Sequence, residues 1–172
     1  MSFVGWALVA GMLAAGAVQE EGTAPVPETL SAFDGCWAGS GAVMGKPVST
    51  RLEVSPVSLG AWKVFEASSV ALGDASDRYE AHILVGGTAS VENGLISYFA
   101  DSFGGDYASA GKGRITTGGF EAEYGYASAT FVNRWQVEGA KVVWTIHARN
   151  PTGEESEFAT YALDRVACAA GE

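Results

Sequence analysis

The residues that build metal and nucleophilic sites are scarce in this sequence. Its 172 residues include two cysteines and two histidines. Zinc sites need several Cys or His side chains at short spacing, whereas Cys36 and Cys168 stand at opposite ends of the chain and His82 lies far from His147. The sequence therefore predicts no metal site, and no cofactor is expected.

Basic residues are also few. Ten Lys and Arg stand against twenty Asp and Glu, which gives a formal net charge of −10. Nucleic-acid binding depends on clustered Lys and Arg that neutralise phosphates. The composition therefore excludes nucleic acid as an expected partner, and the same argument disfavours an anionic membrane surface.

Long apolar runs are absent beyond residue 18. The run from Phe3 to Val18 is shorter than the ~20 residues of a comfortable membrane span. Ala15 and Ala17 resemble a signal-peptidase site, so residues 1–17 are predicted to be a signal peptide although the usual positive charge before the apolar run is missing. A short membrane anchor is the alternative. With cleavage after Ala17, the protein would be periplasmic or secreted and would have no membrane contact.

The rest of the chain divides into a leader and one domain. Residues 18–32 carry Pro25 and Pro27 and little apolar content, so they are predicted to be a flexible leader, with a short helical turn possible around 27–33. The domain is placed at 33–168. Its β-branched and aromatic segments are separated by turn sequences such as "VENG", "TTGG" and "NPTGEE". About ten strands are predicted, at 35–44, 48–55, 61–70, 78–87, 93–101, 106–115, 118–127, 129–138, 141–149 and 156–166.

Alternation within these segments separates a dry face from a wet one. Ala129, Phe131, Asn133, Trp135 and Val137 share one face of their segment, opposite Thr130, Val132, Arg134 and Gln136. Short joints make consecutive strands antiparallel, and a meander of this many strands must close or leave two exposed edges. The predicted fold class is therefore all-β, a single closed antiparallel up-and-down barrel.

Closure would bring the first and last strands together. Two cysteines in an exported chain predict one disulfide, here Cys36–Cys168. Cys36 and Trp37 point to opposite faces of the first strand, and Arg165 and Cys168 differ by an odd number on the last strand. If the cysteines pair on one face, Trp37 and Arg165 meet on the other as a cation–π contact.

The same residues carry a family resemblance. Gly35-Cys36-Trp37 resembles the G-x-W signature of the lipocalins and the wider calycin superfamily, and Arg165 resembles the arginine that covers that tryptophan. The chain is similar to exported bacterial lipocalin-like barrels over 33–168, and more distantly to nitrobindin-like ten-stranded barrels. The resemblance implies a cup-shaped barrel that binds a small apolar molecule. It departs from the usual lipocalin plan because no helix follows the strands.

The barrel interior is therefore the candidate site. Tyr and Trp combine an apolar body with a polar tip that can orient a bound molecule. The expected ligand-binding residues are Tyr124, Tyr126, Trp135, Phe131, Trp144 and Tyr98, while Trp37, Arg165, Cys36 and Cys168 are assigned structural roles. No catalytic residue is assigned and no motif indicates a reaction, so whether the protein is an enzyme stays open, as does its oligomeric state.

Two other functions are kept beside ligand binding. A haem-binding barrel with sensor or isomerase-type chemistry would use His147, yet alternation places His147 with Thr145 and Arg149 on the wet face, where a surface histidine is expected. A protein-interaction module of the cell envelope would use the acidic exterior. Glu121, Glu123 and the acidic turn at 153–157 are interpreted as solvated carboxylates.

Overall fold

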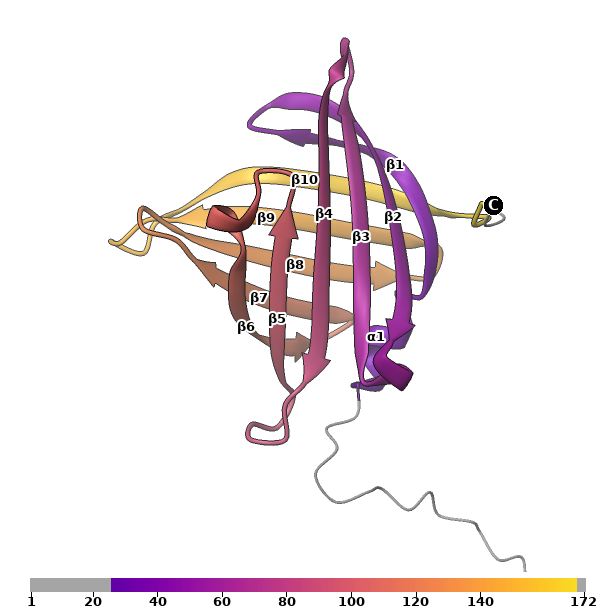
Figure 1. The fold of residues 1–172 in the computed structure, drawn as a ribbon, viewed down its shortest axis with the longest axis vertical. Coiled ribbons are helices and arrows are strands. Elements are labelled where there is room, and N and C mark those ends of the chain that lie inside the picture. Colours follow the sequence, from indigo (N-terminus) through magenta and orange to yellow (C-terminus); the bar gives the residue numbers. More distant parts are fainter. Residues whose placement is uncertain (1–25, 170–172) are drawn as a thin grey trace, which may run out of the picture.

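The strands pair in chain order and the last one returns to the first. The computed structural model describes residues 26–169, in which ten strands form a closed antiparallel barrel in the order β1-β10-β9-β8-β7-β6-β5-β4-β3-β2 (Figure 1). The strands are β1 (Gly35–Val43), β2 (Lys46–Val57), β3 (Trp62–Ala71), β4 (Asp74–Gly87), β5 (Gly94–Asp101), β6 (Ser109–Thr116), β7 (Gly119–Gly125), β8 (Thr130–Glu138), β9 (Lys141–Arg149) and β10 (Glu155–Val166). A short helix, α1 (Glu28–Ser31), precedes them, and two 3-10 turns, η1 (Ser58–Gly60) and η2 (Gly105–Tyr107), interrupt the connections.

The predicted fold class is confirmed, and the strand bounds differ mainly at two joints. β4 begins at Asp74 rather than 78, because the turn is confined to Leu72 and Gly73 and Gly73 takes a φ of 136° that suits glycine. β6 begins at Ser109 rather than 106, because η2 occupies the preceding residues. Within residues 26–169 no helix is long and apolar enough to span a membrane.

β1 pairs with β10, as predicted, and the register brings Trp37 and Arg165 together on one face. Trp37 lies opposite Arg165 and Cys36 opposite Val166. A disulfide joins Cys36 to Cys168, with a Cα–Cα distance of 5.1 Å and 132 residues between them in sequence. Cys168 lies two residues beyond the end of β10. The guanidinium carbon of Arg165 lies 4.0 Å from the ring centroid of Trp37, so the predicted cation–π contact is present.

The segment before β1 closes one end of the barrel. Leu30 and Phe33 are fully buried, and the Trp37 Nε1 donates to the Phe33 carbonyl at 2.7 Å. Arg165 donates to the carbonyls of Asp34 and Ala32 at 2.8 and 3.2 Å. Leu30 belongs to the segment 18–32 that is predicted to be a leader. This part of the segment packs with the domain, because the apolar side chain of Leu30 is buried at the barrel end. The predicted signal peptide 1–17 and the leader residues 18–25 lie outside the described residues.

The same end is sealed by an ion pair. Lys63 points into the barrel and its side chain is 6% exposed, with its Nζ 2.6 Å from the Asp34 carboxylate. A buried ammonium is costly unless it is paired and hydrogen-bonded. The pair therefore fixes the short segment that follows α1 against β3.

Leu30 and Phe33 together are called the plug, and a row of stacked rings fills the barrel interior above them. Phe120, Trp135, Trp144 and Tyr161 lie opposite one another on β7, β8, β9 and β10. Trp135 stacks on Trp144 at 4.2 Å between centroids, and Trp144 stacks on Tyr161 at 4.5 Å. Each such pair contributes about 0.5–1.5 kcal/mol beyond the burial of its area. The rings occupy this part of the barrel and leave the space nearer the other end open.

Candidate functional site

A cavity inside the barrel opens at the end away from α1. The hairpin turns β1–β2, β3–β4, β5–β6, β7–β8 and β9–β10 gather at this end. The cavity has a volume of about 760 Å³. Pockets for drug-sized molecules span roughly 300–1,000 Å³, so this one has room for such a ligand.

The walls and the rim of the cavity differ in chemistry. The walls are apolar and aromatic, formed by Val43, Val48, Ala71, Phe99, Phe131, Ile146 and Phe158. The charged residues that line it are Lys46, Asp77, Arg78 and Asp101. Of these, Lys46, Asp77 and Arg78 are exposed and Asp101 is half-buried. The cavity therefore has a charged opening and an apolar interior.

Polar groups on the walls are buried at the base of the cavity. Ser69, Tyr124, Asn133 and Tyr161 are between 2% and 6% exposed, and together they are called the floor. The Trp144 Nε1 donates to the Asn133 Oδ1 at 2.9 Å. The Tyr124 hydroxyl lies 2.6 Å from the Ser97 Oγ. These bonds hold Asn133 and Tyr124 in place, as an orienting site for a ligand requires.

The floor tyrosines are neutral. Burial raises the pKa of Tyr161 to about 12, and burial raises the pKa of Tyr124 well above its usual range. At the rim, burial and the neighbouring Asp101 carboxylate raise the pKa of Tyr79, whose hydroxyl donates to the Asp101 Oδ2 at 3.0 Å. Phenol hydroxyls at physiological pH can donate or accept a hydrogen bond, but none of these is activated as a nucleophile or base.

Three of the six predicted ligand-binding residues line the cavity. Tyr124, Tyr126 and Phe131 do so. Trp135 and Trp144 point into the barrel but belong to the stacked row beneath the cavity, where each is 1% exposed. Trp144 acts on the site indirectly, through its bond to Asn133.

Tyr98, which is predicted to bind a ligand inside the barrel, lies outside it. Its side chain is 49% exposed and contacts Trp62 at 5.8 Å between centroids. Ser97 and Phe99 are the residues of β5 that point inward, so strict alternation turns Tyr98 outward. Tyr98, Trp62 and Leu84 form an apolar outer surface over β3–β5. The envelope-interaction alternative stays a prediction.

Sequence reasoning did not select Asn133 as a site residue. Its signal was present, since Asn133 is the polar member of the otherwise apolar face of β8 between Phe131 and Trp135. An amide on a dry face needs hydrogen-bond partners inside the protein or in a ligand.

The predicted surface positions of both histidines are confirmed. The His147 Nδ1 lies 3.2 Å from an Arg134 nitrogen on the outside of the barrel, in an ion-pair network that includes Glu121 and Glu155. His82 lies 3.2 Å from the Glu66 carboxylate. The chain has two histidines and neither lines the cavity, so the geometry gives no support to haem ligation by His147.

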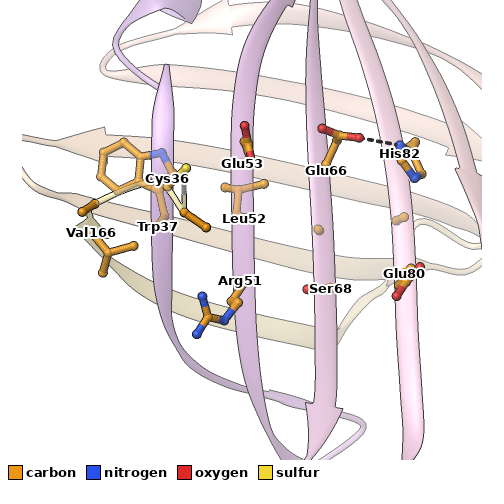
Figure 2. A pocket seen from close by; sticks show the side chains of 14 residues that line it. Cys36, Trp37, Arg51, Leu52, Glu53, Glu66, Ser68, Glu80, His82 and Val166 are labelled. Carbon is orange, nitrogen blue, oxygen red and sulfur yellow. Dashed lines mark ion pairs between the residues drawn. The ribbon is translucent and has the colours of Figure 1, made fainter. Parts of the chain in front are cut away.

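A second hollow lies on the outer surface beside the disulfide. It has a volume of about 370 Å³ and lies over β1–β4. Figure 2 shows Glu53, Glu66 and Glu80 around it, with Glu66 paired to His82. These side chains are exposed. In the part of the chain that the structure describes, no three His, Cys, Asp or Glu side chains are placed to hold a metal ion. The cavity inside the barrel is therefore the stronger candidate site.

Fold and cavity together define a class: closed ten-stranded antiparallel barrels with an apolar hollow open at one end. No protein-family model and no curated protein matches the chain. Among solved structures it is similar to the crystal structure of Rv2717c from M. tuberculosis, with a TM-score of 0.63 and 14% identity over 82% of this chain and 99% of that chain. At this identity the likeness shows the shared barrel fold alone.

Proposed function

We propose that the protein is an exported binding protein that holds a small hydrophobic or amphipathic molecule in the barrel, without covalent chemistry. The observation that carries this proposal is the cavity of about 760 Å³, which has apolar walls, buried polar groups at its base and one open end. Burial of apolar ligand surface supplies about 25 cal/mol per Å² of driving force. The polar floor would then orient what is bound.

Two features support the exported location and the lipocalin-like assignment. Disulfides persist in oxidising compartments, and the Cys36–Cys168 bond accounts for every cysteine of the chain. Residues 1–17 are proposed to be the signal peptide. The indole of Trp37 under the guanidinium of Arg165 supports membership of the calycin superfamily, which stays part of the proposal.

Native mass spectrometry of the exported protein tests the proposal. The full chain is expressed in a bacterium with its own N-terminus, purified from the periplasm without detergent, and sprayed under non-denaturing conditions. We expect a bound species of discrete small mass that organic solvent extracts. Protein that carries no such species, and that takes up none of a set of added apolar probes, would contradict the function.

A matched pair of variants assigns the binding to the cavity. Val48 lines the cavity and is 7% exposed, whereas the next residue, Ser49, points outward. Val48→Trp should reduce ligand occupancy, because the indole occupies space in the cavity. Ser49→Trp should leave occupancy unchanged, and thermal unfolding of both variants confirms that the fold is retained. Equal occupancy in the two variants would place the bound molecule elsewhere.

A further inference from the structure

The hydrogen bonds at the floor fix which atoms remain free to meet a ligand. An indole N–H can only donate, so the Asn133 atom that accepts from Trp144 must be its carbonyl oxygen. The Asn133 amide nitrogen is then left without a hydrogen-bond partner among residues 26–169. Among these residues, Trp135 Nε1 is the one side-chain nitrogen or oxygen that is both sealed from solvent and without a hydrogen-bond partner. The Asn133 Nδ2 also lacks a partner, but it is not sealed from solvent. The Asn133 Nδ2 is therefore open to the cavity that Asn133 lines, as a donor.

The Tyr124 hydroxyl is available as an acceptor rather than as a donor. The single hydroxyl hydrogen of Ser97 is given to the Leu84 carbonyl at 2.9 Å. The Tyr124 hydroxyl must then be the donor in its 2.6 Å bond to the Ser97 Oγ. Because its hydrogen is used, the hydroxyl of Tyr124, which lines the cavity, can meet a ligand only as an acceptor.

Tyr161 completes the set. Its side chain is 3% exposed and lines the cavity, and its hydroxyl has no partner in the described chain. Since that hydroxyl is not among the sealed unbonded atoms either, it is accessible from the cavity. It can act as donor or acceptor. Gly41 makes room for this ring, since a Cβ there would stand 2.6 Å from the Tyr161 Cδ1.

Among the described residues, the floor contains no ionised side chain. Of the charged residues that line the cavity, Lys46, Asp77 and Arg78 are exposed, and the half-buried Asp101 already accepts from the Tyr79 hydroxyl. A buried ion without a partner is strongly disfavoured. A ligand carboxylate or ammonium at the floor would have no counter-charge, whereas a neutral polar group would find a donor, an acceptor and a hydroxyl.

On the condition that the proposed function holds, we propose that the ligand enters head first and that its buried head is an uncharged group which both accepts and donates hydrogen bonds. A carboxamide, a lactam or a hydroxyl has this chemistry. Asn133 donates to the head, Tyr124 accepts from it, and Tyr161 completes the contact. The apolar tail lies toward the rim along Phe99, Phe131 and Phe158.

Four probes with the same ten-carbon chain test this assignment: decanamide, methyl decanoate, decanoate and decylammonium. Their affinities for the full exported chain are measured by calorimetry near neutral pH, after bound material has been extracted. We expect decanamide to bind about tenfold more tightly than each of the others, because one unpaired buried polar group costs about a factor of ten.

Variants assign the preference to the floor. Asn133→Asp keeps the acceptor for Trp144 but removes the amide donor, and it should abolish most of the tenfold preference. Tyr161→Phe removes only a hydroxyl and should reduce the preference severalfold, which keeps the test decisive if Asn133→Asp folds poorly. Tyr98→Phe is the matched control, because it removes the same hydroxyl from a tyrosine on the outside of the barrel, where the side chain is 49% exposed.

The outcomes separate the two proposals. Decanamide preference that disappears with Asn133→Asp or Tyr161→Phe supports the inference. Equal affinities for the four probes, or tightest binding of decanoate or decylammonium, overturns the inference while ligand binding itself stands. Failure of every probe to bind removes support from the proposed function as well.

Discussion

Removal of the disulfide should cost the barrel a large part of its stability. The bond joins residues separated by 132 positions, and a crosslink stabilises mainly by restricting the unfolded chain. In the chain-entropy relation a loop of this length corresponds to about 5 kcal/mol at 25 °C. Domains of this size are stable by about 5–15 kcal/mol in total. We therefore expect the Cys36→Ser/Cys168→Ser double variant to fold with much reduced stability.

Urea unfolding followed by tryptophan fluorescence measures this difference. The double variant should unfold at a far lower urea concentration, and its m value should rise because its unfolded chain is more expanded. Adding reductant should bring the unsubstituted protein to the stability of the double variant and leave the variant unchanged. A difference below about 1 kcal/mol, with the unsubstituted protein shown to be oxidised, would refute the view that the bond ties the two ends of a long loop.

Three further changes test other parts of the fold. Phe33→Ala empties a fully buried site at the barrel end, so it should lower the free energy of unfolding by about 3–5 kcal/mol and Tm by roughly 10 °C. The same change at Phe103, which is 69% exposed, should have little effect. Equal shifts of Tm in calorimetry would contradict the role of Phe33 in closing the barrel end. Arg165→Met should cost about 1–2 kcal/mol through loss of the contact with Trp37, and urea unfolding that shows no loss would remove its structural role. The pKa of Tyr161 is raised from 10.0 to about 12, so between these pH values the folded state keeps a proton that the unfolded chain releases. The contribution of Tyr161 to the free energy of unfolding is therefore complete below pH 10 and is lost as pH rises toward 12, at about 1.4 kcal/mol per pH unit. Tyr161→Phe should make the alkaline loss of stability, measured by urea unfolding, less steep.

The barrel could be predicted because its signals are local. Alternation with period two and glycine-rich turns define the strands, and short joints make neighbours antiparallel. Closure and the pairing of the two cysteines then predicted, by parity, that Trp37 and Arg165 share a face, and in the structure these two residues lie opposite each other. The plug formed by Leu30 and Phe33 could not be predicted in the same way, because α1 has four residues and no helical periodicity to reveal its buried face.

The cavity was only partly predictable. Alternation identifies inward side chains, but Phe131 and Trp135 share one face of β8 and only Phe131 lines the cavity. Which inward residues pack and which border open space depends on the register of four neighbouring strands, which stacks Trp135 between Phe120 and Trp144. Tyr98 was selected for its aromatic character, although its neighbours Ser97 and Phe99 take the inward positions.

Chemical-shift mapping tests the central claim, that the open end of the barrel is a binding site, most directly. The isotope-labelled protein is titrated with decanamide, and backbone amide, asparagine side-chain and indole N–H resonances are followed. Binding in the cavity predicts the largest changes at the Asn133 amide, the Trp144 indole N–H and the inward residues of β8–β10 near the mouth. Changes confined to the outer hollow around Glu66 and His82, or no changes at saturating probe, would contradict the account.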